Sequence, residues 1–135
     1  MIKKLFLLLM VLMAMILGCT KDDHSDDTWK NTLTFGTGLN PSNFFQLAGE
    51  GTIFSPGNVY FRLESKTDYE GYSVKFVVLR NGITHSTEIF SNNPKPTGHI
   101  FISGLNFSQT GTYDVTAYIT SVSETLVAIG TFQIQ

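Results

Sequence analysis

From Thr28 to the C-terminus, short runs of β-branched and aromatic residues are separated by clusters of Gly, Pro, Asn and Ser. Side chains of a strand alternate between its two faces, so the run VYFRLES places Val59, Phe61 and Leu63 together on one face. After residue 18, no stretch of ordinary helix length carries an apolar stripe with a 3.6-residue period. These patterns predict an all-β domain over residues 29–135, made of antiparallel strands.

Turn residues divide this region into strands. Asn81 and Gly82 lie between two strand-like runs, and both tolerate the positive φ that a two-residue hairpin turn requires. The segment SNNPKPTG (91–98) is predicted to be a loop, since its two prolines cannot donate hydrogen bonds to a sheet. Residues 36–54 carry the weakest pattern, and we expect a short helical turn within them, over residues 42–47.

The composition limits the partners and the covalent chemistry of the chain. With 42% hydrophobic and 13% aromatic residues, it has enough apolar surface for a packed core. From Thr28 to Gln135, six Lys and Arg residues stand against seven Asp and Glu residues. No basic cluster lies beyond Lys3 and Lys4, so we expect no nucleic-acid partner. The single cysteine, Cys19, excludes an intrachain disulfide.

The first eighteen residues have the pattern of a secretory signal peptide. Lys3 and Lys4 precede thirteen apolar residues, Leu5 to Leu17, and then a small residue, Gly18. A transmembrane helix needs about 20 apolar residues to cross the bilayer, so this run is too short for a permanent span. We therefore predict that residues 1–18 are removed from the mature protein.

The sequence ILGC at residues 16–19 resembles a bacterial lipobox, in which a small residue precedes the cysteine that becomes the mature N-terminus. The resemblance implies that Cys19 carries a lipid that anchors the protein in the membrane, since two or three acyl chains give stable anchoring. The acidic segment 19–28, which contains KDD at 21–23, resembles the tether of Bacteroidetes-type surface lipoproteins. This second resemblance implies a cell-surface protein of the outer membrane. We expect the tether's carboxylates to be solvated rather than metal-bound.

The C-terminal third resembles the E-to-F region of immunoglobulin-like sandwiches. In GHIFISGLNFSQTGTYDVTAYIT (98–120), an alternating strand precedes a turn and a Gly-x-Tyr-x-hydrophobic segment. Tyr113 stands at the position of that family's tyrosine corner, although Gln109 replaces the usual Asp and Val115 replaces the cysteine of antibody domains. The resemblance is therefore to the broad class. It implies an immunoglobulin-like antiparallel β-sandwich of about seven strands, with a structural role for Tyr113.

Catalytic arrangements are hard to find in this sequence. His24, His85 and His99 have no paired cysteines and no second residue at metal-ligand spacing. A nucleophile elbow, a phosphate-binding glycine loop and an HExxH motif are all missing from the sequence. We therefore expect a non-catalytic binding protein without a cofactor or a metal site.

Aromatic side chains form the first candidate binding surface. Tyr and Trp combine an apolar ring with a polar group, and such rings stack on sugar faces, which favours an accessory glycan-binding function. The alternative for each ring is a place in the core, where aromatic residues are common. The candidates are Tyr60, Tyr69 and Tyr72, together with Trp29, Phe44 and Phe45.

Strand parity predicts the second candidate surface. If Val74, Phe76 and Val78 face the core, the outer face of the same sheet carries apolar side chains. Exposed apolar patches mark partner sites, so the alternative function is a structural or adhesion subunit that binds an envelope protein. A cover formed by residues 36–54, or a bulge near Gly130, would remove this patch. Its predicted members are Val77, Leu79, Tyr118, Val127 and Ile129.

Overall fold

The computed structural model describes residues 28–91, 98–120 and 123–135. The predicted signal peptide, Cys19 and almost all of the tether lie outside these ranges. Within them the chain forms strands and no helix, which confirms the all-β prediction. The strands are β1 (Thr32–Gly36), β2 (Gly38–Asn40), β3 (Asn43–Ala48), β4 (Ile53–Phe54), β5 (Gly57–Glu64), β6 (Ser73–Arg80), β7 (Ile83–Phe90), β8 (Ile100–Phe107), β9 (Gly111–Thr120) and β10 (Glu124–Ile134).

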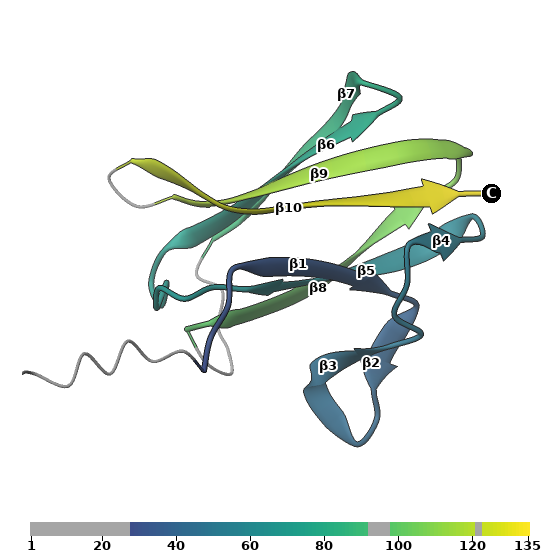
Figure 1. The fold of residues 1–135 in the computed structure, drawn as a ribbon. Helices are drawn as coiled ribbons and strands as arrows, with labels where there is room; N and C mark the ends of the chain where they lie inside the picture. Colours follow the sequence, from purple (N-terminus) through teal and green to yellow (C-terminus); the bar gives the residue numbers. More distant parts are fainter. Residues whose placement is uncertain (1–27, 92–97, 121–122) are drawn as a thin grey trace, which may run out of the picture.

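Two sheets stack face to face (Figure 1). One has the order β1-β5-β8 and the other the order β4-β10-β9-β6-β7, and only the short β4–β10 pairing is parallel. The chain starts in the first sheet with β1 and crosses to the second with β4. The equivalents of immunoglobulin strands B and E (β5 and β8) thus share one sheet, and those of C, F and G (β6, β9 and β10) share the other. The immunoglobulin-like sandwich is confirmed, with eight strands in its two sheets and a separate β2–β3 hairpin.

The core lies between the facing sheets and is filled by the inward residues of each strand. Val59, Phe61 and Leu63 are buried, as the alternation in β5 predicts. The ring of Phe61 lies among rings from both sheets. Four of these have centroids 5.2 to 5.9 Å from its own: Phe35, Phe76, Phe107 and Phe132.

The predicted turn joins β6 and β7. Asn81 has a φ of 50° and Gly82 a φ of 81°, so both residues adopt the left-handed conformation that this kind of turn demands. The side-chain oxygen of Asn81 also accepts a hydrogen bond of 3.0 Å from the backbone N–H of Thr112. The turn is therefore fastened to β9 as well as to its own strands.

The tyrosine corner is present. The buried Tyr113 donates a hydrogen bond of 2.7 Å from its hydroxyl to the carbonyl oxygen of Gln109. Tyr113→Phe is expected to lower the free energy of unfolding by about 1 kcal/mol, because the buried bond is lost while the ring remains. Urea unfolding measures the change. Tyr72→Phe, at an exposed ring, serves as the control, and equal stability of the two variants would contradict a structural role for the Tyr113 hydroxyl.

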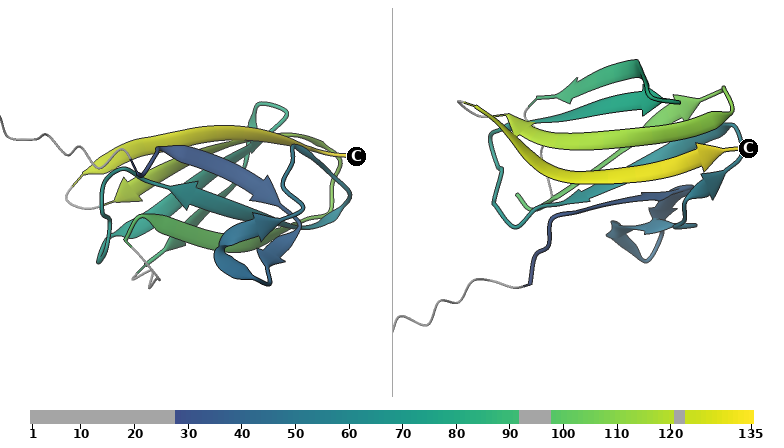
Figure 2. Two further views of the ribbon diagram at one scale, coloured as in Figure 1. Left: turned by 60° about the horizontal axis from the view of Figure 1, so that its bottom comes forward. Right: turned by 45° about the horizontal axis from the view of Figure 1, so that its top comes forward.

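The prediction of a helical turn over residues 42–47 is wrong, because β2 and β3 form a hairpin there. The side-chain oxygens of Asn40 and Asn43 accept hydrogen bonds from the backbone N–H groups of Ser42 and Phe45, respectively, and this closes a tight turn. The hairpin lies beside the three-stranded sheet, away from β9 and β10 (Figures 1 and 2). It therefore leaves the outer face of the five-stranded sheet uncovered.

Candidate functional site

A pocket lies on the outer face of the three-stranded sheet, under the β2–β3 hairpin. We call it the hairpin pocket, and its volume is about 260 Å³. The alternation in β5 turns its polar residues away from the core, and β3 and the segment before β1 supply further side chains. The lining residues are Trp29, Asn43, Phe45, Gln46, Arg62 and Ile100.

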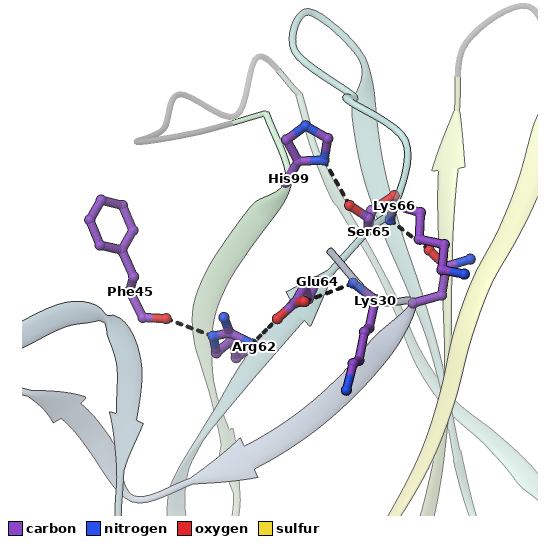
Figure 3. A network of polar contacts seen from close by, with 8 residues as sticks. Lys30, Phe45, Arg62, Glu64, Ser65, Lys66 and His99 are labelled. Carbon is purple, nitrogen blue, oxygen red and sulfur yellow. Dashed lines mark hydrogen bonds and ion pairs between the residues drawn. The ribbon is translucent and has the colours of Figure 1, made fainter. Parts of the chain in front are cut away.

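Arg62 is held in place by contacts with the hairpin and with its own strand (Figure 3). Its Nε donates a hydrogen bond of 2.6 Å to the carbonyl oxygen of Phe45, and its Nη1 lies 2.9 Å from Oε2 of Glu64. Oε1 of Glu64 in turn accepts a bond of 2.8 Å from the backbone N–H of Lys30. A guanidinium has five N–H groups, and these contacts use two of them. Arg62 can therefore donate to a ligand while it stays fixed.

Trp29 borders the same pocket and is oriented by His99. The two rings are stacked, with centroids 4.7 Å apart and an interplanar angle of 2°. Nδ1 of His99 lies 2.8 Å from the carbonyl oxygen of Ser65, which positions the imidazole (Figure 3). The indole held in this way lines the same pocket as Arg62, although the two residues are far apart in the sequence.

The predicted aromatic surface is only partly assembled. Trp29 and Phe45 meet in the hairpin pocket. Tyr60 is half-buried, and its ring lies so close to Gly104 that a methyl group there would be 3.2 Å from it. Tyr72 is 43% exposed, in the loop before β6.

Tyr69 does not belong to a surface, and its prediction as a ligand-stacking residue is wrong. Its side chain is 1% exposed and packs in the core. The loop after β5 folds back because the Tyr69 N–H donates a bond of 2.8 Å to the carbonyl oxygen of Gly98. The alternation of side chains along a strand gives no information about this backbone contact, which holds the loop with the ring facing the core.

Sequence reasoning missed the polar residues of the pocket. Arg62 and Glu64 are two positions apart in the sequence, so the strand pattern could have placed both side chains on one face. The sequence pattern could not assign Asn43 and Gln46 to a pocket, because their segment was predicted to be helical.

The outer face of the five-stranded sheet is the second candidate surface. The strand register places Ile89, Lys75, Tyr118 and Leu126 in one cross-strand row. The next row contains Val77 and Ile129. We call the apolar members of this surface the apolar face: Val77, Leu79, Ile89, Tyr118, Leu126 and Ile129.

Val127 corrects the predicted membership of this face. The register of β10 shifts between Leu126 and Ala128, and Val127 becomes buried in the core. The same bulge brings Leu126 to the outside with 52% exposure, and Ile129 remains outside with 64% exposure. The bulge thus exchanges one residue of the face for another and does not remove the face.

A further hollow, of about 460 Å³, lies where the edges of β1 and β10 approach each other. Phe35 packs against Gly130 at this edge, where a methyl group on the glycine would be 2.8 Å from the ring. Glu50 is the one charged residue in its lining. Three threonines, Thr34, Thr52 and Thr131, also line the hollow. The hairpin pocket combines an indole with a fixed guanidinium, so it is the better candidate.

In the three described ranges, no group of three or more His, Cys, Asp or Glu side chains is placed to hold a metal ion. No helix in those ranges is long and apolar enough to span a membrane.

Comparisons with known proteins leave the family open. No protein-family model matches the chain, and no curated protein matches it. Among solved structures, the chain is similar to the soluble domain of PmoD from Methylocystis sp. ATCC 49242 (Rockwell). That likeness has a TM-score of 0.49 and 10% identity, and it covers 76% of this chain and 89% of the other.

Proposed function

We propose that this protein is a lipid-anchored, non-catalytic binding module of the bacterial cell envelope that binds a glycan in the hairpin pocket. One observation carries the proposal: Arg62 is fixed by Phe45 and Glu64 at a pocket that also contains an indole. Fixed donors and acceptors next to an apolar ring suit a sugar, which has hydroxyl groups around its edge and C–H groups on its faces.

The chemistry of the lining supports this ligand class. The guanidinium of Arg62 donates hydrogen bonds, and the side-chain amides of Asn43 and Gln46 both donate and accept them. Hydroxyl groups need both kinds of partner. Pockets for drug-sized ligands are roughly 300–1,000 Å³, so a pocket of about 260 Å³ suits one sugar unit at the end of a chain or on a branch.

Trp29→Ala is expected to weaken glycan binding at least tenfold, because loss of a ring contact worth about 1.4 kcal/mol changes an affinity tenfold. A glycan array identifies the ligand, and calorimetry with that glycan measures the change. Tyr72→Ala, at an exposed ring outside the pocket lining, is the matched control and should bind like the wild type. An array without signal for the wild-type protein would contradict the proposal.

The anchor belongs to the same proposal. Lipid on Cys19 would hold the protein in the outer membrane, and the KDD segment at 21–23 would direct it to the cell surface. The eight residues from Thr20 to Asp27 span at most about 29 Å when extended. Because only Thr28 separates this segment from Trp29, the pocket would remain close to the membrane surface.

A second candidate function is binding of a protein partner through the apolar face, as a structural or adhesion subunit. The observation that favours it is the bulge at Val127, which leaves Leu126 and Ile129 exposed on a sheet that no other described segment covers. Exposed aliphatic side chains gathered on one face are typical of protein interfaces.

A further inference from the structure

We infer that the occupant of the apolar face is a second copy of this chain, so that the protein is a symmetric dimer. This inference rests on the second candidate function and is independent of the hairpin pocket. It follows from the charges on the face, from its size and from the symmetry that its strand order allows.

The charged side chains on the face have partners within the chain, and one of these contacts is an ion pair. The ammonium group of Lys75 lies 4.8 Å from the ring centroid of Tyr118 and forms an ion pair with Glu124. Asp114 accepts a hydrogen bond of 2.7 Å from the hydroxyl of Thr131. A buried charge without a partner is costly, and an ion pair lowers that cost. Lys75 therefore opposes burial of the face less than an unpaired charge would.

The outer face of the sheet, to which the apolar face belongs, is about large enough for a specific interface. Four strands, β7, β6, β9 and β10, spaced about 4.8 Å apart and about eight residues long at about 3.3 Å each, cover roughly 500 Å² in projection. Two such faces bury roughly 1,000 Å² between them, about the least area that a biological interface needs. Because side chains project from the sheet, the accessible area of each face is larger than its projected area.

One two-fold arrangement would bring residues of two such faces opposite each other. A two-fold axis that runs between β6 and β9, parallel to them, places β7 over the β10 of the partner and β6 over its β9. Ile89 then faces the partner's Leu126, and Lys75 faces the partner's Tyr118. Aligned sheets pack about 10 Å apart in this way.

The same axis suits two anchors in one membrane. Because it runs along the strands, equivalent ends of the two copies lie at the same end of the dimer. Both Trp29 segments therefore leave the sandwich on the same side, and the lipids proposed on the two Cys19 residues would enter one bilayer. From Thr28 to Gln135 the chain has six basic and seven acidic residues, so two copies repel each other only weakly.

Sedimentation of the mature chain, carrying Cys19→Ala to remove the lipid, tests the dimer. The wild-type face should give the mass of a dimer that dissociates on dilution, and Val77→Asp should weaken association at least tenfold, because it buries an unpaired charge at the centre of the interface. Ile129→Asp should also weaken association. Because Ile129 is 64% exposed in the monomer, misfolding would not explain a loss of the dimer in this variant. Ile83→Asp is the matched control at the β6–β7 turn and should leave the dimer intact.

The outcomes separate this inference from the others. A wild-type chain that stays monomeric up to high micromolar concentration overturns the dimer, even if glycan binding through Trp29 persists. A dimer that survives both Val77→Asp and Ile129→Asp also overturns it, because the contact then lies elsewhere. Loss of glycan binding alone would contradict the hairpin pocket and leave the dimer standing.

Discussion

Phe61→Ala is expected to lower the free energy of unfolding by about 3–5 kcal/mol, the usual cost of removing a buried aromatic ring. Phe61 is 1% exposed and contacts rings from both sheets, so its loss leaves a cavity that neither sheet can fill alone. Small domains are stable by only about 5–15 kcal/mol, so this one change removes a large fraction of the total.

Urea or thermal unfolding of the wild type and the variant measures this effect. Phe44→Ala is the matched control, because Phe44 is 68% exposed and its removal should change stability by about 0.5 kcal/mol or less. If both variants unfold at the wild-type urea concentration, Phe61 is not at the centre of a packed core.

Cys19→Ala is expected to abolish acylation and to move the protein from the membrane fraction to the soluble fraction. The acyl chains provide the anchoring free energy, about 0.8 kcal/mol for each buried methylene, so no partial attachment should remain. Labelling with a clickable palmitate and fractionation of cells measure the two effects. Thr20→Ala, next to the cysteine, is the control and should behave like the wild type.

The outcome for Cys19 also bears on where the binding surfaces lie. If the alanine variant is still labelled, the lipid is elsewhere or absent, and the cell-surface proposal loses its support. If the variant is released, surface labelling of the intact wild type then distinguishes an outward-facing protein from a periplasmic one. Neither result depends on the hairpin pocket.

Sequence patterns predicted the structure best where a local rule allows only one conformation. The alternation in VYFRLES predicted the buried residues Val59, Phe61 and Leu63, because a strand between core and outside has only two faces. Asn81-Gly82 predicted its turn, because few residues adopt positive φ without strain. These signals depend on neighbours in the chain.

The patterns failed where contacts between distant segments decide the conformation. Residues 43–48 form a strand, where a helical turn over 42–47 was predicted, because asparagine side chains close the turn and Arg62 binds the hairpin from another strand. Val127 is buried because a bulge shifts the register of β10 against β9. Tyr69 is buried because its backbone pairs with Gly98, which is 29 positions further along the chain.

Local sequence patterns predicted the all-β class, the inward face of the strands and the tyrosine corner at Tyr113, and the lipid site at Cys19 stays a prediction. Each depends on a short stretch whose geometry or chemistry has few alternatives. Which aromatic residues meet in a pocket and which aliphatic residues remain outside depends on contacts between distant segments of the folded chain. Trp29, Phe45 and Arg62 come from separate segments, and only the folded chain brings such segments together.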